Sequence, residues 1–176
     1  MDEAALIQAA CQGDLDAYNR LVLVYQDIVY SQAYRMIGEA EAAEDAAQDA
    51  FISAFRHLSG YRGGSFKAWL LRIVTNACYD ELRRRKRRPT TPLEPLDDDE
   101  EEVESPRWIA DPGESPEQAA ERAELAQALQ HCLDDLPDDF RAVVVLVDVQ
   151  GMDYEEVSHT MGKPLGTVKS SLARAR

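Results

Sequence analysis

Residues 152–176 read MDYEEVSHTMGKPLGTVKSSLARAR and predict two short helices joined by a tight turn. Asp153 is suited to cap the first helix, and Gly162 is suited to end it, because glycine adopts the left-handed conformation without a steric penalty. Pro164 is suited to the start of the second helix. That helix carries an apolar stripe at helical spacing, which consists of Leu165, Val168, Leu172 and Ala175.

The other side of the second helix carries short hydroxyls and cations, namely Thr167, Lys169, Ser170, Ser171 and Arg174. Hydroxyls allow close approach to base edges in a DNA groove, and arginine can bind guanine or phosphate. The pattern is therefore that of a DNA-binding helix-turn-helix. A solvated helical hairpin that ends a domain is the alternative interpretation of the same residues.

The formal net charge of −14 is distributed unevenly along the chain. Residues 89–116 carry ten acidic and one basic side chain, whereas residues 1–88 carry twelve of each. Six prolines and repulsion between like charges prevent residues 89–116 from building a core, so we expect a flexible linker there. The net charge therefore says little about whether residues 1–88 or residues 117–176 bind DNA.

The two flanking segments are expected to be small all-α domains. Helical spacing predicts helices at about 2–12, 14–36, 40–57 and 65–88 in the first segment, and at about 115–136 and 137–150 before the terminal hairpin. Ser65 is suited to cap the helix that follows it, and the helix at 115–136 carries an apolar stripe of Leu125, Leu129, Leu133 and Leu136. Residues 143–149 are rich in valine and could form a strand by propensity. We expect a buried helix instead, because a proline and two aspartates precede the run and no partner strand is evident.

The predicted helix at 65–88 is a second candidate for DNA binding. Arg72, Asn76, Tyr79 and Arg83 are spaced four, three and four residues apart, so they share one face. The helix ends in RRRKRR, residues 83–88, and such a basic tip attracts phosphate. An amide and an aromatic ring above it suit contact with bases. A solvated helix end, with cations favoured by the helix dipole, is the alternative.

Two features flank this helix in the sequence. The turn at residues 59–65, SGYRGGS, contains three glycines that permit close approach of a ligand, and Tyr61 could stack on a base; a plain loop is the alternative. No Walker lysine follows, which argues against a phosphate-loop NTPase. The predicted helix at 40–57 presents a polar surface, either solvated or a docking face for a basic protein, made of Glu41, Glu44, Asp45, Gln48 and Asp49.

Other function classes find little support in the sequence. Cys11, Cys78 and Cys132 are far apart and form no metal or disulfide motif, so we expect three buried thiols. The histidines are isolated and no catalytic motif occurs, so we expect no enzyme activity, cofactor or metal. The acidic amino terminus lacks the features of a signal peptide, and the longest apolar run, residues 142–147, is too short to span a membrane. We therefore expect a cytoplasmic protein without membrane contact of its own.

In combination, these features resemble a bacterial RNA polymerase sigma factor of the extracytoplasmic-function (ECF) type. The resemblance rests on AEDAAQDAFISAFRHLSGYRGGSFKAWLLRIVTNACYDELRRRKR at residues 43–87 and on LPDDFRAVVVLVDVQGMDYEEVSHTMGKPLGTVKSSLARAR at residues 136–176. It covers nearly the whole chain outside the linker. It implies that residues 1–88 form sigma domain 2 and that residues 117–176 form sigma domain 4.

The resemblance also implies roles for individual residues. Docking on the clamp helices of core RNA polymerase would use Glu44, Asp45, Gln48 and Asp49. Holding a base flipped from the −10 element would use Tyr61, Arg62, Ser65 and Phe66, and contacting the non-template strand and upstream duplex would use Arg72, Asn76, Tyr79, Arg83 and Arg84. Reading the −35 element of promoter DNA would use Thr167, Lys169, Ser170, Ser171 and Arg174.

Further properties of the family are expected on the same ground. The acidic linker would run through the RNA-exit or active-site channel of the polymerase. An anti-sigma factor would mask the polymerase-binding surfaces. The family's recognition helix normally continues past the position of Arg176. Two alternatives remain: a stand-alone helix-turn-helix regulator, which would dimerise and bind DNA without polymerase, and an acidic helical adaptor that binds only proteins.

Overall fold

The computed structural model describes residues 2–87 and 115–176, and these residues form helices and no β-strand. The helices are α1 (Glu3–Cys11), α2 (Leu15–Ile37), α3 (Ala40–His57), α4 (Phe66–Arg87), α5 (Pro116–Asp134), α6 (Asp138–Val144), α7 (Tyr154–Met161) and α8 (Leu165–Ala175). A 3₁₀ turn, η1 (Leu58–Gly60), follows α3, and a π-helical turn, η3 (Val145–Val149), follows α6. The expected all-α fold class is confirmed. The expected linker, residues 89–116, falls almost entirely outside the described residues.

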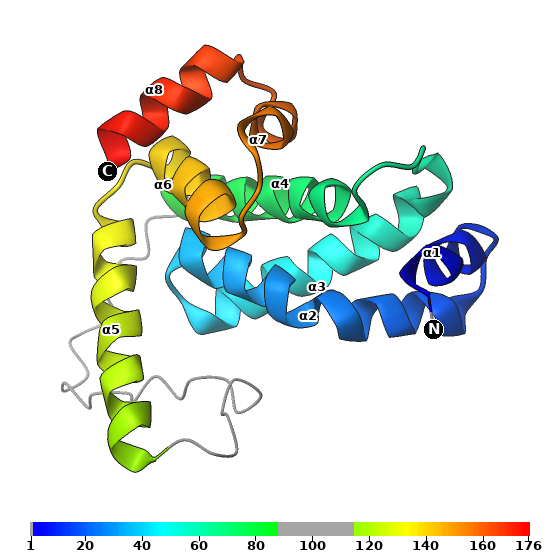
Figure 1. Ribbon diagram of the computed structural model, residues 1–176, viewed down its shortest axis with the longest axis horizontal. Helices are drawn as coiled ribbons and strands as arrows, with labels where there is room; N and C mark the ends of the chain where they lie inside the picture. The colour runs from blue at the N-terminus through cyan, green and yellow to red at the C-terminus, as the bar shows by residue number, and fades with distance from the viewer. Residues whose placement is uncertain (1, 88–114) are drawn as a thin grey trace.

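The first half of the protein, residues 2–87, is a bundle in which α2, α3 and α4 lie alongside one another and α1 crosses the beginning of α2 (Figure 1). The buried face of α3 consists of alanines, among them Ala43, Ala50 and Ala54, which are fully buried. Small side chains allow neighbouring helices to approach closely, which explains why an alanine-rich acidic helix can lie at the centre of this bundle. Its acidic residues face outward.

Local capping signals in the sequence are confirmed. The Asp153 carboxylate accepts from the backbone N–H of Glu156 at 2.8 Å, and the Glu156 carboxylate accepts from the N–H of Asp153 at 3.2 Å. This reciprocal pair is a capping box that begins α7. Gly162 ends α7 with φ of +63°, a left-handed conformation that favours glycine.

The valine-rich run at residues 143–149 is helical, as predicted. Val143 and Val145 are buried, and so is Leu146, so burial in a helix accounts for the run's apolar character. The last turn widens into η3, in which Gln150 N–H donates to the carbonyl of Val145 at 2.9 Å. The β propensity of valine is outweighed here by tertiary packing.

The two halves of the protein share their packing. Leu71 of α4 lies in one apolar cluster with Val143 and Val168 of the second half, residues 115–176. Leu133 and Val145 of the second half lie in the main apolar cluster of the first half. Figure 1 shows α6 lying between α8 and the α2–α4 bundle. The domain boundaries at residues 88 and 117 stay a prediction.

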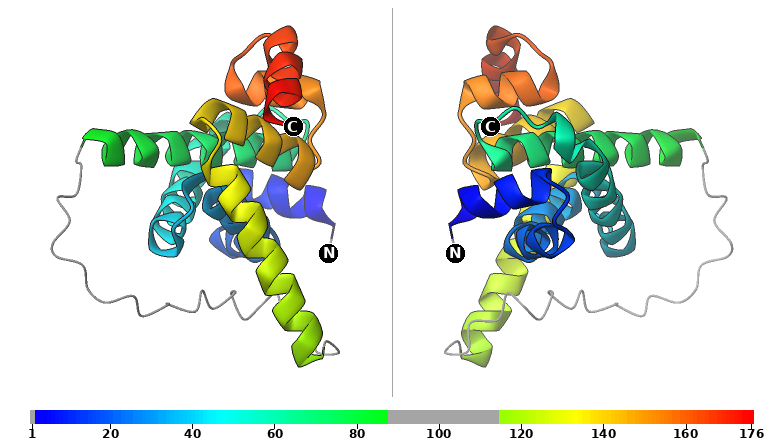
Figure 2. Two further views of the ribbon diagram at one scale, coloured as in Figure 1. Left: turned by 90° about the vertical axis from the view of Figure 1, so that its left-hand side faces the viewer. Right: turned by 90° about the vertical axis from the view of Figure 1, so that its right-hand side faces the viewer.

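Two expectations about burial differ from the structure. The predicted leucine stripe of α5 is buried only at its carboxyl end: Leu133 is 2% exposed, whereas Leu125 is 71% exposed. The reason is that α5 meets the end of α2 only with its carboxyl half, while its amino end projects away from the body, as both views in Figure 2 show. Cys78 is buried as expected and Cys11 is half-buried, but the expectation is wrong for Cys132, which is exposed on α5.

Candidate nucleic-acid interface

The outer side of α8 is an open polar face. Val168 and Leu172 anchor the helix, at 0% and 3% exposed, and their burial turns the opposite side to solvent. That side exposes Thr167, Lys169, Ser170 and Arg174. The Lys169 ammonium lies 5.9 Å from the centre of the Tyr154 ring, and Ser170 Oγ donates to the Thr167 carbonyl at 3.0 Å. The face combines cations with short hydroxyls, as a groove-reading helix requires.

Ser171 is placed differently from the rest of the predicted −35 set. It is 7% exposed and lies between the buried positions Val168 and Leu172. Three residues after Val168, a side chain returns to the same side of a helix, so Ser171 faces inward. We therefore remove Ser171 from the candidate contact set and assign it to the packing of α8.

One face of α4 carries the residues predicted to share it. Arg72, Asn76 and Arg83 are exposed. Tyr79 is half-buried, and its hydroxyl donates to Asp139 Oδ1 of the second half at 2.9 Å. Burial, and next the hydrogen bond to Asp139, raise the pKa of Tyr79, so its phenol stays protonated and can donate. The predicted face therefore exists, and the second half contacts it.

Arg84 lies on a different side of α4. Its Nε is 2.8 Å from Glu81 Oε2, and it lines a groove between α3 and α4 together with Asp45, Gln48 and Asp49. These three α3 residues are exposed, as is Glu44. The structure thus groups Arg84 with the predicted polymerase-docking residues, because a shift of one residue from Arg83 rotates the side chain by about 100°.

The turn before α4 is organised by aromatic packing. Phe66 is 4% exposed, and its ring centre lies 5.5 Å from that of Tyr61 and 5.4 Å from that of Trp69. Phe66 is therefore a core residue that supports Tyr61, and we remove it from the set expected to contact DNA. Trp69 is half-buried in the same cluster and packs against the core.

Tyr61 itself bridges its own turn, since its hydroxyl donates to the Gly64 carbonyl at 2.7 Å. Gly63 and Gly64 have φ of +91° and +93°, so only glycine fits these two positions without strain. Ser65 Oγ accepts from the N–H of Ala68 at 3.1 Å, which confirms it as the predicted cap of α4. Arg62 and Ser65 are exposed on this rigid turn.

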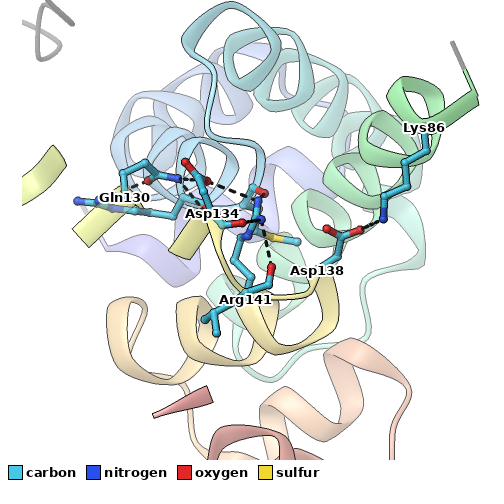
Figure 3. Close-up of polar contacts among 8 residues, drawn as sticks. Lys86, Gln130, Asp134, Asp138 and Arg141 are labelled. Atoms are coloured by element: carbon cyan, nitrogen blue, oxygen red, sulfur yellow. Dashed lines mark hydrogen bonds and ion pairs between the residues drawn. The ribbon is translucent and has the colours of Figure 1, made fainter. Parts of the chain in front are cut away.

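The sequence patterns did not reveal the polar residues that join the two halves. Arg141 is 8% exposed, and its guanidinium donates to the carbonyl of Met36 at 2.7 Å and to those of Asp134 and Leu136 at 2.9 and 3.2 Å. An arginine inside the apolar run FRAVVVLV was the available signal, because a buried cation needs acceptors nearby. Asp138 contacts Lys86 in the same region (Figure 3).

Comparisons with known proteins identify both halves. Residues 21–88 match sigma-70 region 2, and residues 126–176 match sigma-70 region 4. The chain is 37% identical to the RNA polymerase sigma-H factor of Pseudomonas aeruginosa over 172 residues, which is 97% of this chain and 88% of that protein. It is 41% identical to the ECF RNA polymerase sigma factor SigE of Mycolicibacterium smegmatis over 165 residues, which is 94% of this chain and 61% of that relative's length.

A solved structure resembles the whole arrangement. CnrH, determined in complex with the cytosolic domain of CnrY, aligns over 98% of this chain and 90% of its own, with a TM-score of 0.67 and 25% sequence identity. Among the helices within residues 2–87 and 115–176, none is long and apolar enough to cross a membrane. The matched regions, their order and the relatives that span nearly the whole chain show that this protein belongs to the ECF sigma factors of the sigma-70 family, which direct RNA polymerase to promoters.

Proposed function

We propose that the first half reads the −10 element and the second half the −35 element, while α3 holds core RNA polymerase. The observation that supports this division is the presence of two separate polar faces, one on α4 and one on α8, each within a matched sigma-70 region. Two modest DNA contacts become selective when the polymerase fixes their separation, because linkage raises the effective concentration of the second contact.

The −10 contact would use the rigid turn and the exposed face of α4. Tyr61 offers an aromatic ring beside the exposed side chains of Arg62 and Ser65. Capture of a flipped base there would offset the few kcal/mol that unstacking costs. Asn76 would hydrogen-bond a base edge, and Arg72 and Arg83 would bind backbone phosphates. The protein would assist melting without any bond chemistry of its own.

The −35 contact would use Thr167, Lys169, Ser170 and Arg174 of α8, inserted in the major groove. On α3, the three acids Glu44, Asp45 and Asp49 are suited to a basic docking partner, and we assign them, with the neighbouring Gln48, to the polymerase clamp. An anti-sigma factor is the proposed regulator, by analogy with CnrH, whose structure contains the cytosolic domain of CnrY. Each of these steps would take place in the cytoplasm.

Asn76→Ala tests the −10 assignment. We expect promoter-specific initiation with purified core polymerase to fall about tenfold, since a lost hydrogen bond to a base costs about 1–1.5 kcal/mol. Binding to core polymerase should be retained, because Asn76 lies outside the α3 surface. Asn19→Ala, an exposed asparagine on α2, is the matched control. Unchanged initiation by Asn76→Ala would remove the residue from the site, and absence of any initiation by wild-type protein across a genomic promoter pool would refute the proposed function.

A further inference from the structure

The α4 face and the start of α8 lie too close together to serve both elements of a promoter. Arg72 of α4 and Leu165, the first residue of α8, line one pocket together with His159 of α7. The −10 and −35 elements are about 25 base pairs apart, which is about 85 Å at 3.4 Å per base pair. A compact body in which the α4 face and the start of α8 share one pocket cannot reach both elements. The described arrangement is therefore a closed form that must open before promoter binding.

The closed form places carboxylates of α6 on the basic end of α4. Lys86 Nζ lies 2.6 Å from Asp138 Oδ2, and the Tyr79 hydroxyl donates to Asp139 Oδ1 at 2.9 Å. Lys86 and Tyr79 are seven residues apart, so they lie on the same face of α4. The Asp138 carboxylate at the Lys86 ammonium and the Asp139 carboxylate at the Tyr79 phenol each offer the negative charge and the acceptor atoms of a DNA phosphate. These contacts therefore occupy groups that a DNA backbone would otherwise use.

Other contacts hold the halves in this position. Arg141 of α6 donates to the Met36 carbonyl at the end of α2, one of the terminal carbonyls that lack a partner within the helix. Arg35 of α2 donates to the Ala126 carbonyl of α5 at 3.2 Å, and Gln130 of α5 donates to the Arg35 carbonyl at 3.4 Å. Lys67 of α4 donates to the Gln150 carbonyl at 2.6 Å. Together with the acidic contact, these polar contacts between the two halves form the polar seam.

We propose that Asp138 and Asp139 are an autoinhibitory element, which imitates DNA phosphate on α4 and keeps the first half from DNA until the two halves separate. The proposal rests on the assignment of the α4 face to DNA. It adds that the second half itself regulates that face. Core polymerase would release the element by holding the halves apart, and excess DNA phosphate would compete with it.

Affinity for DNA without polymerase gives the first test. The probe is a fluorescein-labelled single-stranded oligonucleotide of twenty thymidines, measured by anisotropy at fixed salt. Asp138→Asn/Asp139→Asn should bind about three- to tenfold more tightly than the matched control Asp135→Asn/Glu121→Gln, which removes two exposed acids of the second half. Equal affinity of the two double variants would overturn the proposal. Circular dichroism melting confirms that both variants are folded.

Zero-length crosslinking gives the second test. Carbodiimide joins a carboxylate to an amine only where they touch, so peptide mass spectrometry of the free protein should show a Lys86–Asp138 crosslink. The yield should fall at least about fivefold in the complex with core polymerase and promoter DNA, in which phosphates occupy the basic tip. No crosslink in the free protein, or an equal yield in the complex, would contradict the closed form.

One further substitution distinguishes failure of the autoinhibition from failure of the DNA assignment of α4. Arg83→Ala is added to Asp138→Asn/Asp139→Asn and to the control pair, and the oligonucleotide affinity is measured again. If Arg83→Ala weakens binding equally in both backgrounds and the backgrounds themselves do not differ, autoinhibition fails while α4 remains a DNA-binding face. If Arg83→Ala changes neither, the DNA assignment of α4 fails first.

Discussion

The faces of α4 and α8 have similar chemistry but different surroundings. On α8, Thr167, Ser170 and Arg174 point to solvent, and Lys169 lies over a ring of the neighbouring helix. On α4, Tyr79 and Lys86 are held by carboxylates of α6, from about sixty and fifty residues further along the chain. A DNA-binding pattern on a helix therefore predicts the chemistry of its face, but it does not predict whether that face is accessible.

The difference originates in packing. The inner side of α8 is buried within its own half, through Val168 and Leu172. By contrast, α4 has two packed sides: Leu70 and Val74 lie in the core of the first half, and Leu71 lies in the cluster that it shares with the second half. Leu71 therefore packs against the second half, and the acidic contacts lie beside this apolar cluster.

Truncation of Leu71 should have the largest effect on the stability of the protein. Leu71→Ala deletes a fully buried side chain, and we expect the free energy of unfolding to fall by about 2–5 kcal/mol. Urea denaturation monitored by circular dichroism measures the change. Leu125→Ala, at a leucine that is 71% exposed, is the control and should stay within about 0.5 kcal/mol of wild type. Equal effects of the two substitutions would show that α4 is not packed against the second half in solution.

The polar seam between the two halves should contribute less to the free energy of unfolding than Leu71 does. Arg141→Met keeps much of the volume but leaves the carbonyls of Met36, Asp134 and Leu136 without their donor, which should cost about 1–3 kcal/mol. Hydrogen exchange should show the loss at the end of α2 as well as in the second half. Arg56→Met, at an exposed arginine of α3, should change neither measurement. Loss of protection in the second half alone would mean that Arg141 stabilises only its own half.

The smallest effect concerns Asp139. The hydrogen bond from Lys163, and next that from Tyr79, hold the pKa of Asp139 below its usual value, against the opposing effect of burial. A lowered pKa in the folded state means that the stabilisation is present above the unfolded pKa of about 3.9 and is lost as the pH falls through the folded value. Because the side chain is 57% exposed, we expect less than about 1 kcal/mol.

The measurement compares wild type with Asp139→Asn by urea denaturation at pH 7 and at pH 3. The gap in free energy of unfolding between the two proteins should narrow at pH 3, where the wild-type carboxyl approaches the neutral state of the amide. Asp135→Asn serves as the control, because Asp135 is an exposed acid of the same half. A gap that widens at pH 3 would mean that the hydrogen bonds to Asp139 do not stabilise the folded protein.

Much of the fold was predictable because its signals are local. Asp153, Gly162 and Ser65 mark helix ends through contacts within four residues, and the apolar period of α8 indicates which side of that helix is buried. The same periodicity placed Arg72, Asn76, Tyr79 and Arg83 on one face. Phe66 was expected to contact DNA because of the family resemblance, and Ser171 because it was assigned to the outer side of its helix. Both expectations are wrong, because the two side chains are only 4% and 7% exposed.

Spacing within single helices is thus enough to predict the helices, their two-sided character and the chemistry of the candidate DNA-binding faces. Three other features depend on tertiary packing: α4 faces the acidic start of α6, Arg141 joins the ends of α2 and α5, and α5 leaves Leu125 exposed. The two groups of features differ in the range of the contacts behind them. The tertiary contacts join helices through side chains up to 105 residues apart, and their partners are selected by the packing of whole apolar faces rather than by any local pattern.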